Sequence, residues 1–325
     1  MSALVRLEPP SPCPPHRFVR YARKSDAVAR VGVLLPPRPD DAAFASLIHV
    51  PTFPSRDGAA PTSPSTMSEL LMLYASRAVE MRTNDHAPTP LDECVLLPAV
   101  DASAQIACVG KNYLEHVGEV DSSLPGISRA DVPTSPIIFS KASTSLCAHG
   151  DAVETRGRAD VDYEGELVAV IGRACKDVDA ALSDEEVVSR YVMGWSVAND
   201  VTARGLQKTH QQWYLGKSCD TFCPLGPWVC CAPDRAPTLG AAEIVTRVNG
   251  EVRQRSTVDK MIFNVAELVR CVSRYQTLRP GDALLTGTPS GVGAGYNPPR
   301  FLQPGDVCEI HISGVGVLEN RVIER

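Results

Sequence analysis

Two glutamates, Glu164 and Glu166, stand two positions apart in an extended run with an apolar tail. Alternate residues of a strand share a face, so the two carboxylates point the same way. They repel each other unless a cation lies between them or one is protonated. Asp200 ends a second apolar run, and three carboxylates favour Mg²⁺, Mn²⁺ or Ca²⁺ over zinc. A solvated polar face is the alternative interpretation of the glutamate pair.

A histidine and a glutamate, His116 and Glu119, are three positions apart. One helical turn would bring their side chains together. A carboxylate beside an imidazole orients the ring and raises its basicity, as a general base requires. A surface ion pair is the alternative interpretation of the same spacing.

Two glycine-containing runs do not fit nucleotide-binding motifs. Gly216-Lys217-Ser218 resembles the end of a phosphate loop, but Gln211 stands where the first glycine is required. Residues 286–293 lack the G-x-G-x-x-G spacing. They predict a tight loop after a strand, whose backbone could approach a ligand.

Composition excludes several classes of protein. The 325 residues carry 38 acidic and 32 basic side chains, a net charge of −6, so a nucleic acid partner is not expected. Apolar runs are far shorter than the roughly 20 residues of a membrane helix, so no membrane association is expected either. The apolar fraction of 44% is that of a folded chain.

The 11 cysteines indicate a compartment. Their number is odd, no C-x-x-C pair is present to start a zinc ribbon, and no secretory leader pattern opens the sequence. We expect reduced thiols in a cytoplasmic protein. Several arginines among the first 30 residues keep a mitochondrial leader as the alternative.

Proline divides the chain, because 15 of its 27 prolines lie in the first 100 residues. We expect an accessory domain over residues 1–100 and a catalytic domain over 101–325. The first part predicts extended runs at 18–22, 28–35 and 47–50, and a helix over 70–81 behind the capping box of Thr66 and Glu69. The stripe of that helix predicts docking on the catalytic part, and residues 87–90 predict a Pro-containing connection.

The second part is rich in strand patterns. Asn249-Gly250 predicts a type I′ turn between strands at 245–248 and 251–255. Ser183 caps a short helix, and residues 264–275 predict an amphipathic one. Two Leu-x-Pro-Gly-Asp turns, at 278–282 and 302–306, each lead into an apolar strand.

An ordered set of motifs resembles the fumarylacetoacetate hydrolase family over about residues 104–325. The motifs are CVGKNY at 108–113, PIIFSK at 136–141, DYEGEL at 162–167, ANDVTAR at 198–204, GK at 216–217, DT at 220–221 and TGTP at 286–289. The runs at 212–217 and 220–227 are similar to those of members with a short N-terminal domain, some of which are described as acting on oxaloacetate.

The resemblance implies an α+β, β-rich fold: a mixed β-sandwich roll with a small N-terminal α/β accessory domain, usually homodimeric. It places Glu164, Glu166 and Asp200 on the metal ligands, with Mg²⁺ expected and Mn²⁺ or Ca²⁺ as alternatives. The other implied roles are catalytic for the lid pair His116 and Glu119 and for Lys217, which lines the site. Lys141, Arg204, Gln207 and Thr288 are implied to bind the substrate. Gly205 departs from the family, which commonly has an acid there, and Cys219 stands where an aromatic is common.

The implied activity is divalent-metal-dependent hydrolysis of a C–C bond in a small 2,4-dioxo acid, such as an acylpyruvate or fumarylpyruvate, through a stabilised enolate. The same site could instead tautomerise or decarboxylate oxaloacetate. A third hypothesis is a catalytically silent protein that keeps the fold and binds a ligand. The expected partner is a small 2-oxo acid.

Overall fold

Strands form most of the ordered elements in the computed structural model, which describes residues 16–34, 47–52, 63–77, 82–123, 132–210, 212–231 and 239–325. The helices are α1 (Met67–Arg77), α2 (Leu114–Ser123), α3 (Asp184–Tyr191), α4 (Arg204–Thr209), α5 (Tyr214–Lys217) and α6 (Val265–Tyr275). The large sheet holds β1 (His16–Arg23), β2 (Ala29–Leu34), β3 (Leu47–Thr52), β4 (Arg82–Pro90), β5 (Cys94–Leu96), β6 (Ile106–Gly110), β7 (Ile137–Ser140), β8 (Leu146–Cys147), β11 (Gly165–Ile171), β12 (Val192–Asn199), β14 (Cys223–Cys231) and β17 (Ala283–Leu285). A second sheet holds β9 (Ala152–Glu154), β15 (Glu243–Val248), β16 (Glu251–Thr257), β18 (Val307–Ile312) and β19 (Gly316–Ile323), and β10 (Val161–Asp162) pairs with β13 (Thr202–Ala203).

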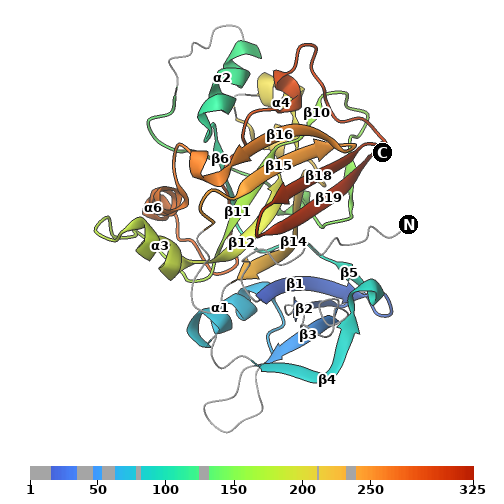
Figure 1. The fold of residues 1–325 in the computed structure, drawn as a ribbon, viewed down its shortest axis with the longest axis vertical. Helices are drawn as coiled ribbons and strands as arrows, with labels where there is room; N and C mark the ends of the chain where they lie inside the picture. The colour runs from blue at the N-terminus through green and yellow to red at the C-terminus, as the bar shows by residue number, and fades with distance from the viewer. Residues whose placement is uncertain are drawn as a thin grey trace.

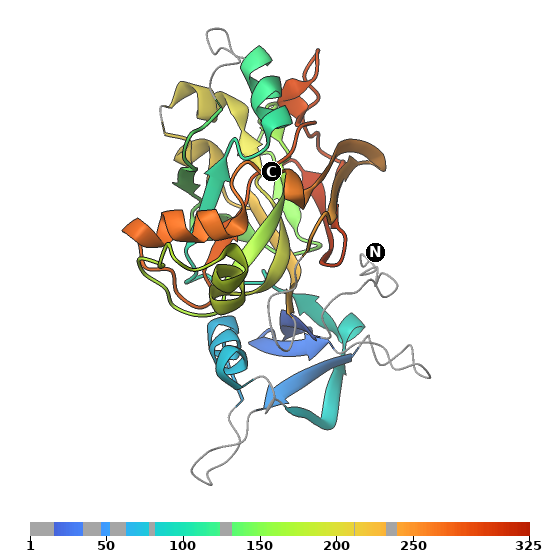
Figure 2. The same cartoon turned by 60° about the vertical axis from the view of Figure 1, so that its left-hand side comes forward.

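The two large sheets lie against each other, as Figure 1 and Figure 2 show from two sides. β11, β12 and β14 of one sheet face β15, β18 and β19 of the other, and apolar side chains such as Leu167, Val197 and Ile310 fill the space between them. This packing confirms the prediction of an α+β, β-rich sandwich.

The N-terminal strands continue the large sheet, because β1 pairs with β14 in an antiparallel register. α1 covers this part of the sheet through Leu70, Leu71 and Tyr74, and the Tyr74 ring meets Phe18 edge to face at 4.8 Å. The predicted extended runs and capped helix are confirmed where they fall on described residues. The end of that helix, at 78–81, lies outside them.

The prediction for residues 87–90 is wrong, since this segment is strand and not a connection. Thr89 and Pro90 pair with Ile48 and Leu47 at the end of β4. β4 is an edge strand, where proline's missing N–H interrupts no second ladder.

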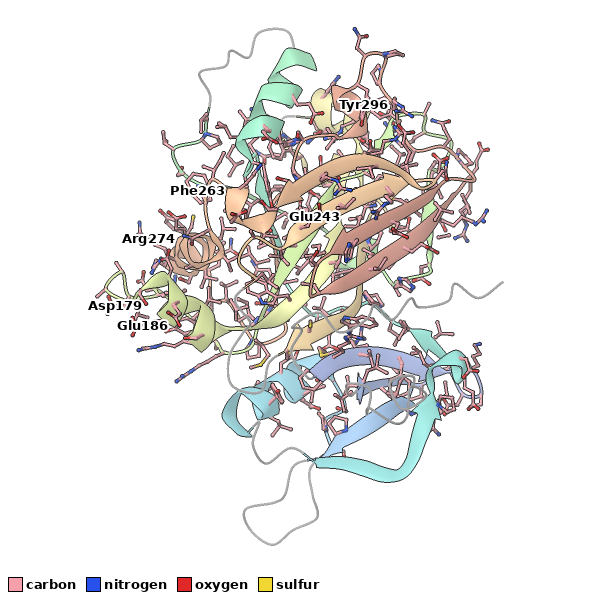
Figure 3. The ribbon with its side chains drawn as sticks, in the orientation of Figure 1. Asp179, Glu186, Glu243, Phe263, Arg274 and Tyr296 are labelled. Atoms are coloured by element: carbon pink, nitrogen blue, oxygen red, sulfur yellow. The ribbon has the colours of Figure 1, made fainter. Side chains whose placement is uncertain are left out.

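Several local predictions in the second part are confirmed. Asn249 and Gly250 take positive φ angles of 53° and 81° in the turn between β15 and β16. Ser183 and Asn264 cap α3 and α6 in full capping boxes. Figure 3 shows Glu186 and Arg274 on these two helices, outside the sandwich.

The docking of α1 generates a stability prediction. Leu70 is fully buried, so Leu70→Ala should destabilise the protein by about 2–5 kcal/mol through lost transfer energy and a cavity. Met72→Ala, at a side chain that is 47% exposed on the same helix, is the control and should change little. Urea unfolding measures both, and equal effects would contradict the docking described here.

His149 generates a pH prediction. Its Nδ1 accepts a hydrogen bond from the Glu319 amide at 3.1 Å, and burial lowers its pKa to about 4. The folded state therefore favours the neutral imidazole over the charged one. The contribution of His149 to the free energy of unfolding is complete above pH 6.5 and is lost as the pH falls towards 4. Between pH 7 and pH 5 the wild type should lose about 2 kcal/mol more unfolding free energy than His149→Gln. Identical pH slopes in urea titrations would contradict this.

Candidate active site

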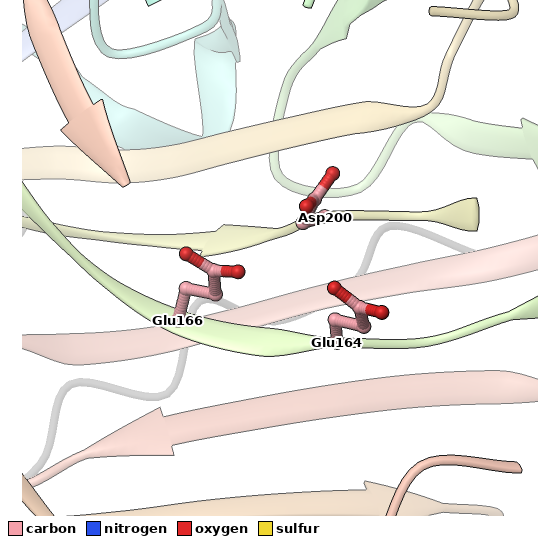
Figure 4. Close-up of side chains that lie close together, drawn as sticks. All are labelled: Glu164, Glu166 and Asp200. Atoms are coloured by element: carbon pink, nitrogen blue, oxygen red, sulfur yellow. The ribbon is translucent and has the colours of Figure 1, made fainter. Parts of the chain in front are cut away.

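Strand register assembles the acidic residues. β11 and β12 are antiparallel with Gly165 opposite Asn199, so the start of one strand meets the end of the other. Glu164, Glu166 and Asp200 each offer an oxygen within 4.8 Å of the other two, and all three are buried (Figure 4). We call these three residues the acidic cluster. The predicted strand is interrupted at Glu164, whose amide bonds the Asn199 side chain, yet both glutamates face the same side.

Three buried cations surround the acidic cluster. Lys217 Nζ lies 2.7 Å from Glu164 Oε2 and 2.6 Å from Asp200 Oδ2. Lys141 Nζ lies 2.5 Å from Asp200 Oδ1, and an Arg204 nitrogen lies 2.7 Å from Glu164 Oε1. Burial works against a charged Lys217, but Asp200 and Glu164 raise its pKa overall. Lys217 is therefore an ammonium ion in this arrangement.

The two glutamates of the acidic cluster differ in their electrostatic surroundings. Burial would raise the pKa of Glu164, but Lys217 and Arg204 hold it at about 2. Burial, Asp200 and Glu164 together raise the pKa of Glu166 well above its ordinary value. Among the described ion pairs Glu166 has no cationic partner, and it accepts only the Gly287 amide at 2.7 Å.

The residues of the acidic cluster fit a divalent metal ion. Their donors are all carboxylate oxygens, which Mg²⁺ and Mn²⁺ prefer over the nitrogen and sulfur ligands of zinc. A dication would also neutralise Glu166, whose negative charge burial and its neighbours make costly. Glu164, Glu166 and Asp200 are the residues that would hold it.

A cavity of about 420 Å³ opens beside the acidic cluster. Its wall includes seven of the predicted site residues, namely His116, Glu164, Glu166, Arg204, Gln207, Lys217 and Thr288. His116 Nδ1 lies 3.4 Å from Glu119 Oε2 on α2, so the predicted helical pair is present. Such contacts are often long without substrate.

The remaining polar residues of the site are held by protein contacts. Arg204 donates to Gln207 Oε1 at 3.1 Å, and the Thr288 hydroxyl bonds the Gly165 carbonyl at 3.0 Å. Lys141 does not line the cavity; it contacts Asp200 and the Val201 carbonyl. Its proposed contact with substrate, like the roles of Arg204, Gln207 and Thr288, stays a prediction.

The two departures from the family pattern have structural explanations. Asp160 accepts the Gly205 amide and occupies the space that a Gly205 side chain would need, so it supplies an acid at that point. Arg204 is held by Asp162 and Glu164 regardless. Cys219 does not line the cavity; its Sγ lies 3.6 Å from the Leu215 carbonyl.

Sequence reasoning missed three cationic or aromatic wall residues and one carboxylate. Lys111, Lys208 and Trp213 line the cavity, and Lys111 takes a positive φ of 55°. Asp162 is fully buried behind Arg204. Lys111 and Asp162 both stand in motifs that the sequence analysis quoted. Sequence spacing does not show that Lys111 lines the cavity or that Asp162 contacts Arg204 and Gly293.

The chain belongs to the fumarylacetoacetate hydrolase family. Residues 105–323 match the family model described as fumarylacetoacetate (FAA) hydrolase C-terminal. This match covers the cavity and the acidic cluster.

Similar proteins are known from several organisms. The chain is 40% identical over 239 residues to oxaloacetate tautomerase YisK of Bacillus subtilis, covering 73% of this chain and 72% of that protein. It is 34% identical over 324 residues to the mitochondrial oxaloacetate tautomerase Fahd2a of Rattus norvegicus, covering 98% and 95%. The solved fumarylacetoacetate hydrolase of Exiguobacterium antarcticum superimposes with a TM-score of 0.71 at 33% identity, covering 95% of this chain and 100% of that one.

The acidic cluster generates a metal-binding prediction. Mg²⁺ or Mn²⁺ at 100 times its Kd should stabilise the protein by about 2.7 kcal/mol, and excess EDTA should abolish activity. Glu166→Gln should fold and lose most of this stabilisation, because it removes one charged ligand with little change of shape. Glu243→Gln, on β15 and outside the cavity, is the control for the same substitution away from the site. Melting curves with and without metal measure both variants; full activity in EDTA would overturn the prediction.

Proposed function

We propose that the protein interconverts the keto and enol forms of oxaloacetate. The observation that carries the proposal is that one cavity is lined both by Glu164 and Glu166 of the acidic cluster and by His116, which contacts Glu119. The relatives named oxaloacetate tautomerase support this reaction over the C–C hydrolysis expected from the family resemblance.

The chemistry follows from the wall of the cavity. A bound divalent ion would polarise the 2-oxo group and stabilise negative charge on its oxygen. His116, on the wall of the cavity, would take the proton from the carbon beside that carbonyl, and Glu119, 3.4 Å from Nδ1, would orient the ring. Lys111 and Lys208 at the wall carry the charge that a second carboxylate requires.

Lys217 is proposed as a charge-stabilising group. Its ammonium ion already contacts two carboxylates, so it is a poor base but a ready hydrogen-bond donor to a developing oxyanion. In the enol-to-keto direction the 2-hydroxyl group would lose its proton to solvent and the carbon would gain one from protonated His116; the reverse reaction would reverse both transfers.

Hydrolysis of a 2,4-dioxo acid is the second candidate function. The family model described as a hydrolase and the solved hydrolase from Exiguobacterium antarcticum favour it. In that reaction His116 would activate water against a second carbonyl rather than take a proton from carbon.

The other functional expectations stay proposals. None of the helices in the described part of the chain is long and apolar enough to cross a membrane.

We propose a cytoplasmic homodimer with an accessory domain before about residue 100. The name of the rat relative supports a mitochondrial location as the alternative.

The proposed reaction predicts a selective effect of His116→Ala. This variant should slow ketonisation of enol-oxaloacetate by at least about 10²-fold, the usual scale for removing a general base. Metal-induced stabilisation should persist, because His116 is not in the acidic cluster. Enol absorbance measures the rate, and His311→Ala on β18 is the control.

Parallel assays separate the candidate functions. Acid release from an acylpyruvate reports hydrolysis, and CO₂ release from oxaloacetate reports decarboxylation. Lys217→Met should impair every reaction that places charge on the 2-oxo oxygen. An unchanged ketonisation rate in His116→Ala, with metal binding intact, would refute the role given to this histidine.

A further inference from the structure

Asp162 is a fully buried carboxylate that lies between the acidic cluster and the loop after β17. It is not part of the acidic cluster and does not line the cavity. Both of its oxygens are used, which is expected of a buried charge. Apart from the neighbouring Tyr163 amide, which donates to Oδ1 at 2.9 Å, its partners form two groups, one side chain and one loop backbone.

The first group leads to the acidic cluster. Arg204 Nε donates to Asp162 Oδ2 at 2.8 Å, and a terminal nitrogen of the same guanidinium lies 2.7 Å from Glu164. A planar guanidinium held at two edges has little freedom to rotate. Asp162 therefore fixes the arginine that contacts Glu164.

The second group is the backbone of the loop after β17. The amides of Gly293 and Ala294 donate to Asp162 Oδ1 and Oδ2 at 2.7 and 2.9 Å. They belong to η6 (Gly293–Gly295), a single turn of 3₁₀ helix. The carboxylate thus holds this turn through two charge-assisted hydrogen bonds.

The same loop holds α2. The Gly291 amide lies 3.0 Å from each Glu119 oxygen. A side chain on Gly295 would overlap the Glu119 carboxylate, and φ of Gly295 is not positive, so space rather than backbone conformation requires glycine here. Among the described elements α2 packs mainly on η6.

We propose that Asp162 is a positioning residue that couples the acidic cluster to α2. The connection runs from Glu164 through Arg204 to Asp162, then through η6 and Gly291 of the same loop to Glu119 and His116. Each contact is buried or partly buried, so a shift at one end displaces the other. The proposal rests on the proposed function only in giving α2 the general base.

Hydrogen exchange of the α2 amides tests the coupling without any substrate. Asp162→Asn puts an amide NH₂ or a neutral oxygen against the donors of Arg204 and Ala294. Exchange of 114–123 should rise at least roughly tenfold, as expected for the loss of a charge-assisted hydrogen bond. The matched control is Asp282→Asn: Asp282 is equally buried and accepts the Gln105 and Arg279 amides, away from the cavity.

A second variant reaches the same contact from the other end. Gly295→Ala leaves Asp162 and Arg204 unchanged and pushes Glu119 out of its place. It should also raise exchange of α2. Unchanged exchange of α2 in folded Asp162→Asn, or an equal rise in Asp282→Asn, would overturn the proposal. If Asp162→Asn does not fold, unchanged exchange in Gly295→Ala would overturn it.

Turnover of oxaloacetate at saturating Mg²⁺ gives an independent readout. If Asp162 acts through Glu119, Asp162→Asn should lower kcat in the wild-type background and change it by less than about threefold in Glu119→Ala. If the double variant loses kcat by the product of the two single-variant factors, the coupling between Asp162 and Glu119 is contradicted. If the wild type does not tautomerise oxaloacetate, the proposed function fails, while the exchange measurement still decides the role of Asp162.

Discussion

The site depends on the need to neutralise carboxylates that the fold has removed from water. Isolated buried charges cost several kcal/mol each, so Glu164, Glu166 and Asp200 can lie together only with compensating cations. Lys141 and Lys217 surround Asp200, and Arg204 and Lys217 surround Glu164. Glu166 receives a backbone amide instead, which leaves it as the carboxylate with most to gain from a divalent ion.

This requirement links the site to the topology of the sheet. Glu166 lies on β11, Glu164 directly before it, and Asp200 directly after the paired strand β12. Lys141 directly follows β7, and Arg204 and Lys217 lie on α4 and α5, elements that no local pattern joins. β17 lies beside β11, and the loop that follows it brings the Gly287 amide to Glu166 and the η6 turn to α2. The sandwich therefore sets the position of each charge before any ligand binds.

Sequence patterns predicted the parts of this arrangement that are local. The spacing of Glu164 and Glu166, the turn at Asn249, the cap at Ser183 and the helix over 264–275 depend on neighbours in the chain, and each matches the structure. The sequence pattern also suggested Asp200 as a third carboxylate at a second strand end, whereas Lys141, Arg204 and Lys217 came only from the family resemblance.

Long-range pairing explains what the sequence did not predict. The proline content changes near residue 100, but the large sheet continues across this point, because β1 pairs with β14. Pro90 is typical of a connection between elements, yet it lies on the edge strand β4 and pairs with Leu47. Asp162 begins the DYEGEL motif, but the motif does not show that its carboxylate accepts hydrogen bonds from backbone amides 131 and 132 positions away.

The most direct test of the account is anomalous diffraction from a crystal grown with Mn²⁺. We expect one strong peak per chain at about 2.0–2.6 Å from oxygens of Glu164, Glu166 and Asp200, the range of carboxylate ligation, with the Lys217 ammonium displaced from at least one of them. A crystal containing Mn²⁺ elsewhere, or none, with the acidic cluster still bonded to Lys217 as it is here, would contradict the account.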